Sequence, residues 1–231
     1  MNELLDILRE YNFERLGHRL SEPIVINCVP GAGKTHLIRA LLERCESFVA
    51  FTTSSPDPQN LSGKRIQHTS ELKETNKLIL LDEYQNLTEL PAKVFAIFGD
   101  PLQSTNPFLL PADFVCYETR RFGKATASLL QSLNFRVLSN LEDTLIVEDI
   151  FSGELEGQVI CFESEVANLL RAHSVDFLTP CTCQGKSFEV VTFVTSGEFS
   201  EINRHQHLIC LTRHRSKLKI LSPEAKYPDN L

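Results

Sequence analysis

The residues best suited to chemistry in this sequence form the stretch GAGKT, which comprises Gly31, Ala32, Gly33, Lys34 and Thr35. The stretch follows an apolar run and precedes a helix-like pattern, so it is predicted to connect a strand to a helix. Its glycines free the backbone of this turn, and the N–H groups at the start of the helix can then face a phosphate. Lys34 supplies a positive charge for the β- and γ-phosphates, and the Thr35 hydroxyl is a suitable ligand for Mg²⁺. We therefore expect ATP or another nucleoside triphosphate to bind here with Mg²⁺.

Two carboxylates follow at the end of another apolar run, in LILLDEY. Asp82 stands at the carboxyl end of a predicted buried strand, where a carboxylate can hold Mg²⁺ directly or through water. Glu83 is placed to polarise an attacking water as a general base. Gln103, in FGDPLQ, can reach a γ-phosphate or its water, although by residue chemistry alone this is a polar turn after a strand. The full phosphate-loop motif has glycine where this chain has Cys28.

The composition excludes several classes of protein. The chain has 231 residues and a net charge of −7, which disfavours a general polyanion binder. No apolar run approaches the ~18 residues of a membrane span, and the N-terminus lacks the basic region of a secretory signal. Seven scattered cysteines indicate free thiols in a reducing compartment. The basic strip from Arg204 to Lys219 is the exception to the acidic charge, and it suits phosphates or single-stranded nucleic acid.

Short apolar runs without alternation recur along the chain, as expected for strands that are buried on both faces of a parallel sheet. The predicted strands are 24–29, 47–53, 77–83, 94–100, 144–149, 158–163, 175–180, 188–194 and 207–212. Helix-like patterns lie between them, which predicts an α/β architecture. Residues 54–65 and 104–113 are rich in turn formers and are predicted loops. We expect two domains, 1–120 and 121–231, with an N-terminal helix at 1–20 that packs Leu4, Leu5 and Leu8 on the core.

The order of GAGKT, LDEY, FGDPLQ and LTRHRSK resembles the motif order of superfamily 1 helicases, especially those of positive-strand RNA viruses of plants. The resemblance implies a P-loop NTPase fold with two RecA-like parallel-sheet domains and an ATP-dependent RNA helicase or NTPase activity. It supports catalytic roles for Lys34, Glu83 and Gln103. Arg213 in LTRHR matches the family's arginine finger, with Arg215 as a less certain companion.

Three further segments resemble helicase motifs. ETRRFG matches a motif whose arginine contacts the nucleotide, and Arg121 is the better match than its neighbour Arg120. FTTSSP resembles the segment in which Thr52 would touch nucleic acid. TCQGKSFEVV resembles the motif in which Gln184 and Gly185 would contact nucleic acid and phosphate.

A helicase core of this length, starting at its own Met1, resembles the triple-gene-block movement proteins of potex-like and carla-like plant viruses rather than a fragment of a replicase. The resemblance implies binding of single-stranded viral RNA, ATP hydrolysis, passage through plasmodesmata from the host cytoplasm, and suppression of RNA silencing. The implied partners are the two small membrane proteins of the triple gene block, the coat protein, host silencing factors and further copies of the chain.

Two alternatives remain open. The protein can be an RNA- and host-protein-binding module with a vestigial ATPase. It can also be a P-loop nucleoside kinase, since LDEYQNL resembles a stretch of thymidine kinases, but the CxxC pairs of that family are missing. The chain has no Trp and four Tyr, so stacking on bases is limited, and we expect backbone-directed, salt-sensitive RNA binding.

Overall fold

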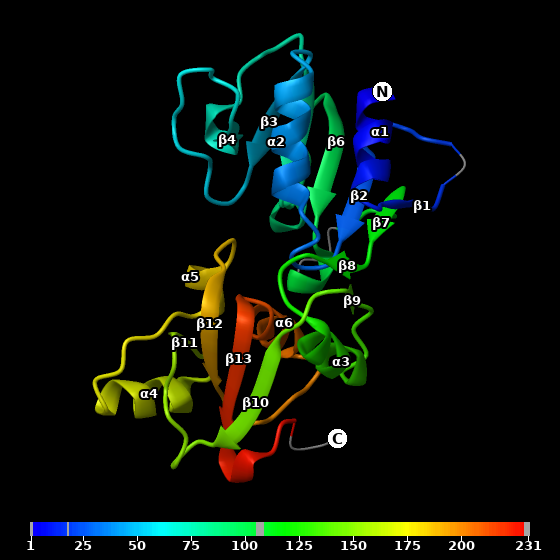
Figure 1. Cartoon of the computed structure of the whole chain (residues 1–231). Helices are drawn as coiled ribbons and strands as arrows, with labels where there is room; N and C mark the ends of the chain where they lie inside the picture. The colour runs from blue at the N-terminus through cyan, green and yellow to red at the C-terminus, as the bar shows by residue number, and fades with distance from the viewer. Residues whose placement is uncertain (1, 18, 105–108, 229–231) are drawn as a thin grey trace. The chain divides into compact units, whose positions relative to one another are not determined.

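The computed structural model describes residues 2–17, 19–104 and 109–228, and the chain divides into two compact units, Met1–Glu118 and Thr119–Leu231 (Figure 1). Each unit is an α/β fold built on a largely parallel sheet, which confirms the predicted fold class of two RecA-like domains. The sequence placed the domain boundary after residue 120. Four residues of the predicted loop 104–113, namely 105–108, lie outside the described residues.

The first unit is built on a seven-stranded sheet with the order β1-β7-β2-β6-β5-β3-β4. Every strand pair is parallel except β1 with β7. The strands are β1 (Glu14–Arg15), β2 (Ile24–Cys28), β3 (Phe48–Thr52), β4 (Ile66–His68), β5 (Leu78–Asp82), β6 (Val94–Gly99) and β7 (Phe114–Cys116). The helices are α1 (Asn2–Glu10) and α2 (Lys34–Arg44), with the 3₁₀ turns η1 (Thr69–Glu71), η2 (Tyr84–Asn86) and η3 (Pro101–Gln103). The four apolar runs predicted as strands in this unit form β2, β3, β5 and β6.

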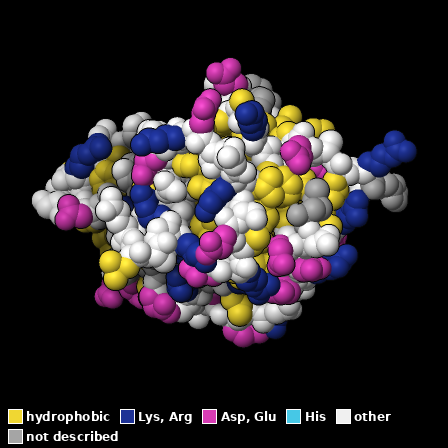
Figure 2. Space-filling model, turned by 90° about the horizontal axis from the view of Figure 1, so that it is seen from above, with side chains coloured by type: hydrophobic (Ala, Val, Ile, Leu, Met, Phe, Trp, Pro, Cys, Tyr) yellow, Lys and Arg dark blue, Asp and Glu magenta, His cyan; other side chains and the backbone are white. Residues whose placement is uncertain are grey.

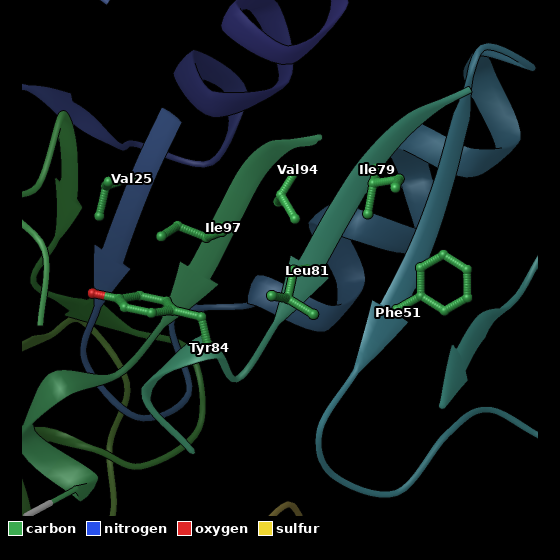
Figure 3. Packing of buried hydrophobic residues seen from close by; sticks show 7 residues of the cluster. All are labelled: Val25, Phe51, Ile79, Leu81, Tyr84, Val94 and Ile97. Carbon is green, nitrogen blue, oxygen red and sulfur yellow. The ribbon is translucent and has the colours of Figure 1, made fainter. Parts of the chain in front are cut away.

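Alternate residues of these strands build a core on one face of the sheet (Figure 3). The cluster consists of Val25, Phe51, Ile79, Leu81, Tyr84, Val94 and Ile97. Helix α2 lies behind the sheet in this view (Figure 3), and the partly buried Val49, Leu72, Leu87, Leu90 and Leu110 pack against the cluster. Tyr84 also anchors the turn after β5, because its hydroxyl donates to Asn27 Oδ1 of β2 over 3.1 Å. The packing fixes the carboxyl ends of β2, β3, β5 and β6 along one edge.

The N-terminal helix is shorter than predicted. Helix α1 ends at Glu10, whereas the sequence analysis predicted a helix over residues 1–20, of which Met1 and His18 lie outside the described residues. Asn12 has a left-handed φ of 61°, which stops the helix and lets the next N–H groups bind its last carbonyls. Three apolar side chains of α1 are fully buried: Leu4, Ile7 and Leu8. Leu5, predicted on the buried face, is only half-buried.

The second unit has an all-parallel four-stranded sheet with the order β10-β13-β12-β11. Its strands are β10 (Thr144–Asp149), β11 (Gln158–Ile160), β12 (Phe188–Val194) and β13 (His214–Ser222). Its helices are α3 (Lys124–Ser132), α4 (Ser164–Ala172), α5 (Pro180–Cys183) and α6 (Arg204–Leu211), with the turn η4 (Pro223–Ala225). A separate two-stranded sheet pairs β8 (Glu118–Thr119) with β9 (Leu138–Ser139).

Two predicted strands of this unit are wrong. Residues 207–212 lie in and directly after helix α6, because a helix buried on all sides has the same unbroken apolar run as a buried strand. Residues 175–180 contribute one isolated bridge, between Leu178 and Ile160, before α5 begins. Strand β13, between β10 and β12, was missed because basic residues interrupt its apolar pattern.

A buried histidine sits in an aromatic cluster of the second unit. His207 of α6 is 0% exposed, and the rings around it are those of Phe162, Phe193, Phe199 and Tyr227. Its Nε2 donates to the Glu198 carbonyl over 3.0 Å, so Nδ1 accepts from the Tyr227 hydroxyl over 2.7 Å. Burial lowers the pKa of His207 from 6.5 to about 4. The imidazole is therefore neutral in the folded protein at neutral pH.

Acid should destabilise the second unit through His207. Its folded-state pKa lies below its unfolded value, so the unfolded chain binds more protons and stability is lost as the pH falls from 6.5 towards about 4. Between pH 6.5 and 5 the free energy of unfolding should fall by about 2 kcal/mol through this group. Urea unfolding followed against pH measures it, with His207→Gln expected to flatten the dependence. The exposed His173→Gln is the control, and equal slopes in both variants would contradict the assignment.

No helix in the described parts of the chain has the length and hydrophobicity needed to cross a lipid bilayer.

Candidate functional site

The predicted phosphate loop connects the end of β2 to the start of α2. Gly31 and Gly33 have φ values of 79° and 98°, a left-handed conformation that side chains with a Cβ rarely adopt. The Ala32 N–H donates to the Val29 carbonyl over 3.3 Å, which closes the turn. Gly33 is the N-cap of α2 and has no side chain to bind the first N–H groups of the helix. This end of α2 is therefore suited to bind phosphate.

Lys34 is a buried cation among acids. Its residue is 9% exposed, and its Nζ lies 3.6 Å from Glu83 Oε1. Burial acts to lower the pKa of Lys34, but the surrounding negative groups, led by Glu83, Asp82 and Asp100, outweigh it and raise the pKa above its ordinary value. The lysine is thus held in its charged form, which a phosphate clamp requires.

Thr35 and Asp82 come together as a magnesium site requires. The Thr35 hydroxyl donates to Asp82 Oδ2 over 3.4 Å, and Asp82 Oδ1 accepts from the Glu83 N–H over 3.0 Å. Burial and the Glu83 charge raise the pKa of Asp82 to about 7, against the lowering effect of Lys34. Hydroxyl and carboxylate oxygens are the ligands that Mg²⁺ prefers, and nucleotide complexes supply the rest from phosphate and water. The residues present therefore fit Mg²⁺.

Glu83 is held in a specific orientation. Its backbone has a left-handed φ of 58°, uncommon for a residue with a side chain and frequent at functional sites. The Thr53 hydroxyl donates to the Glu83 carbonyl over 2.8 Å, and the Gln85 amide donates to the Glu83 carboxylate. This carboxylate, 18% exposed, lies at the carboxyl edge of the sheet beside Lys34. It is placed to accept a proton from water.

Sequence reasoning missed the acid at the end of β6. Asp100 is fully buried, and burial raises its pKa to about 6 against the lowering effects of Lys34 and a hydrogen bond from Gln103. That bond ties the predicted catalytic amide of Gln103 to Asp100. The Asp100 N–H donates to Gln85 Oε1 over 3.2 Å, so Gln85 links Asp100 to Glu83. An acid directly after a buried strand was the signal for Asp100, the same as for Asp82.

Thr52, the predicted nucleic-acid contact of this unit, lies at the end of β3. It pairs in register with Asp82 of β5 and is 3% exposed. Its hydroxyl accepts from the Ser54 N–H over 3.1 Å, so it shapes the loop after β3. Contact of this segment with nucleic acid stays a prediction.

The second unit brings Arg121 and Arg213 together around one threonine. Arg121 Nη1 donates to the Thr212 carbonyl over 3.1 Å, and Arg213 Nη2 donates to the Thr212 hydroxyl over 3.3 Å. Arg213 is 1% exposed, and its Nε donates to the Ile209 carbonyl over 3.0 Å. Arg121 is half-buried and Arg215 exposed. The predicted arginine finger is therefore engaged within its own unit in this structure.

Gln184 and Gly185 lie in the turn after α5. Gln184 is the C-cap residue and is half-buried, while Gly185 is exposed and has a left-handed φ of 78°. Arg213 Nη1 donates to the Lys186 carbonyl over 3.5 Å, which connects this turn to the predicted arginine finger. The structure thus joins the segments TCQGKSFEVV and LTRHR within the second unit.

A buried acid–histidine pair next to Arg213 was also missed by sequence reasoning. His214 Nε2 lies 2.9 Å from Asp143 Oδ2, and both side chains are fully buried. The pKa of Asp143 is lowered to about 2, because hydrogen bonds from His214, Thr126 and the Gly123 backbone outweigh burial. A Cβ on Gly123 would lie 2.3 Å from the Asp143 nitrogen, so glycine permits this contact. The pair holds the start of β13 against the segment that carries Arg121.

Comparisons with known proteins show the family to which the chain belongs. Residues 24–222 match the family model of the viral superfamily 1 RNA helicase core domain. The chain is similar to the movement and silencing protein TGBp1 of Poplar mosaic virus (isolate ATCC Pv275), with 46% identity over 98% of this chain and 99% of that protein. It is 41% identical to the protein of the same name from Lily symptomless virus, again over 98% and 99% of the two chains.

Solved structures show the same fold. The PRRSV helicase aligns with a TM-score of 0.64 and 19% identity, over 96% of this chain and 54% of that one. The arterivirus nonstructural protein 10 helicase, solved with DNA, aligns with a TM-score of 0.58 and 16% identity, over 96% of this chain and 58% of that one. The chain therefore spans a little over half the length of these helicases, and the likeness concerns the fold.

Replacing Lys34 by alanine should destabilise the first unit in a pH-dependent way. The pKa values of Asp82 and Asp100, about 7 and about 6, already lie above their ordinary value, so ionising these acids opposes folding as the pH rises. Loss of the cation raises both pKa values further. We expect a loss of about 2–4 kcal/mol in the free energy of unfolding at pH 8 and a clearly smaller loss at pH 5.

Chemical denaturation at the two pH values checks this expectation. Lys34→Ala/Asp82→Asn should regain part of the stability, because one of the uncompensated acids is gone. The exposed Lys73→Ala is the matched control. A loss of the same size at pH 5 and pH 8 would show that the charge cluster is not the cause.

Proposed function

Because the chain belongs to the viral superfamily 1 RNA helicases, and within them to the TGBp1 movement and silencing proteins, we propose that it binds single-stranded viral RNA and hydrolyses ATP, or another nucleoside triphosphate, with Mg²⁺. This activity would serve the transport of the viral genome from cell to cell through plasmodesmata. The observation that carries the proposal is the cluster of Lys34, Thr35, Asp82 and Glu83 at one sheet edge.

The first unit would hold the nucleotide by its phosphates. The backbone of Gly31, Ala32 and Gly33 provides N–H groups at the start of α2, and Lys34 provides a fixed positive charge. Thr35 and Asp82 would hold Mg²⁺, which neutralises phosphate charge when bound.

Hydrolysis requires a water to be deprotonated as it attacks the γ-phosphate. Glu83 would accept that proton, since its carboxylate is oriented by Gln85 at the same edge as the phosphate loop. Gln103 would orient the water, and its bond to Asp100 fixes the amide near this edge. The catalytic roles that the sequence predicted for Glu83 and Gln103 are therefore part of this proposal.

The second unit would supply positive charge to the transferred phosphoryl group. An arginine at that point contributes about 10³–10⁵ in rate. Arg213 has to exchange its acceptors, the carbonyls of Ile209 and Lys186, for phosphate before it can act as the finger. Arg121 is half-buried, shares Thr212 with Arg213, and would contact the nucleotide.

RNA would be bound through Thr52 in the first unit and Gln184 and Gly185 in the second. Suppression of RNA silencing is inferred from the relatives' name alone. The remaining proposals rest on the resemblance to the movement proteins. The proposed partners are the two small triple-gene-block membrane proteins, the coat protein, host silencing factors and further copies of the chain. The proposed location is the host cytoplasm, with recruitment to plasmodesmata.

The burial of Arg213 favours one second candidate. A binding module with a vestigial ATPase would keep the fold and the phosphate loop while its arginine finger serves only packing. The presence of Cys28 instead of the outer glycine of the phosphate loop also favours the binding module.

ATP hydrolysis by the purified chain, with and without single-stranded RNA, separates these candidates. We expect turnover that RNA stimulates and that Glu83→Gln lowers by about a hundredfold or more, while nucleotide binding persists because the carboxylate does not hold the phosphates. Lys34→Ala should lose binding and turnover together, and Lys73→Ala should match the wild type. RNA binding without turnover would favour the binding module.

RNA affinity should fall as salt concentration rises, because contacts to the phosphate backbone release counterions. Fluorescence anisotropy with a single-stranded oligonucleotide measures the slope of log affinity against log salt. Arg215→Ala, which removes an exposed cation of the basic strip, should reduce that slope by about 1. Lys226→Ala, outside the strip, should leave it unchanged. An affinity that does not respond to salt would exclude backbone-directed binding.

A further inference from the structure

The first unit has a pocket at the edge of its sheet opposite to the phosphate loop. It occupies about 370 Å³ between the carboxyl end of α2, the start of β3 and the segments that precede β4 and β5. In Figure 1 this is the end from which the parallel strands set out, whereas the phosphate loop lies where they finish. Figure 2 looks onto that end and shows Lys and Arg side chains interspersed with acidic and hydrophobic ones. No catalytic residue of the proposed ATPase lines the pocket.

Three cations and one acid line this pocket. Arg65 is held in place, because its Nη2 lies 2.7 Å from Glu71 Oε2 and its Nη1 donates to the Asp57 carbonyl over 3.3 Å. Lys64 Nζ lies 3.4 Å from the carboxylate of Glu46, whose side chain is 85% exposed. Lys77 is exposed and forms no ion pair with the described residues. Since Lys64 is paired with Glu46 and Arg65 with Glu71, Lys77 is the cation of the lining whose charge no ion pair with the described residues offsets.

The lining also has groups that suit a sugar and a base. Thr75 and Gln67 contribute a hydroxyl and an amide to the lining, and Phe48 and Val49 are two of its apolar residues. The Thr75 hydroxyl already accepts from the Lys77 N–H over 3.1 Å and keeps its own proton to donate. The volume lies within the ~300–1,000 Å³ of small-molecule sites, well above what an inorganic phosphate fills. A lining that combines cations, hydrogen-bonding groups and apolar residues matches a phosphate attached to a nucleoside.

We propose that this pocket is a second nucleotide site, which binds a nucleoside monophosphate unit independently of the phosphate loop. The phosphate, with a charge of about −2 at neutral pH, takes the place of the Glu46 carboxylate beside Lys64 and recruits Lys77. Glu46 is then a competitor for the site. The proposal does not depend on ATP hydrolysis by the chain.

Titration calorimetry of the whole chain with uridine 5′-monophosphate in magnesium-free buffer tests the proposal. This ligand has no β- or γ-phosphate for Lys34 to clamp. Lys77→Ala should weaken binding by about fivefold, the value of one exposed charge pair. Glu46→Gln should strengthen it by a similar factor, because the competing carboxylate is removed. Uridine, which lacks the phosphate, should bind more weakly, and the exposed Lys73→Ala should match the wild type.

Competition with single-stranded RNA separates two sources of the nucleotide. Displacement of the monophosphate by RNA identifies the ligand as one unit of an RNA strand, and simultaneous binding identifies it as a free nucleotide. Either result supports the site. Lack of binding at millimolar monophosphate, or equal affinities for wild type, Lys77→Ala and Glu46→Gln, overturns it, whether or not the chain hydrolyses ATP.

Discussion

The first unit depends on the placement of one cation, Lys34, among three acids at the carboxyl edge of its sheet. The acids are Asp82, Glu83 and Asp100. Parallel pairing of β2, β6 and β5 brings their carboxyl ends together, and with them the phosphate loop, Asp82 and Asp100. Glu83 adds a third carboxylate directly after β5. Without Lys34, whose pKa is raised by these acids, the edge would hold only negative charge in a buried place. Hydrophobic packing positions the strands, and the positive charge of Lys34 offsets the repulsion among the carboxylates at the edge that the strands share.

Sequence patterns identified the parts of the site that are local. GAGKT and LDEY are runs of neighbouring residues, and β2, β3, β5 and β6 are unbroken apolar runs because they are buried on both faces. Asp100 follows a buried strand as Asp82 does, but its link to Glu83 through Gln85 was missed because that link arises from strand order. β6 lies between β2 and β5 in the sheet but follows both in the chain, and no sequence window contains that adjacency.

The second unit shows a different limit of sequence reasoning. An apolar run reports burial and not the type of element, so α6 was taken for a strand while β13, interrupted by Lys217 and Lys219, was not recognised. Matching Arg213 to a helicase motif gave its place in the chain but not its burial, which follows from the carbonyls that the end of α6 presents to it. Its link to Arg121 through Thr212 is likewise a product of the fold.

The raised pKa values of Asp82 and Asp100, about 7 and about 6, mean that this edge of the sheet stores protons near neutrality. Since Mg²⁺ binds the carboxylate and not the carboxylic acid, its binding at Asp82, as proposed above, would displace the proton from any protonated Asp82 into the solvent. Protons and Mg²⁺ would then compete for the same pair of oxygens. Occupancy of the proposed metal site would fall on mild acidification, which would make it a readout of the acidity around it.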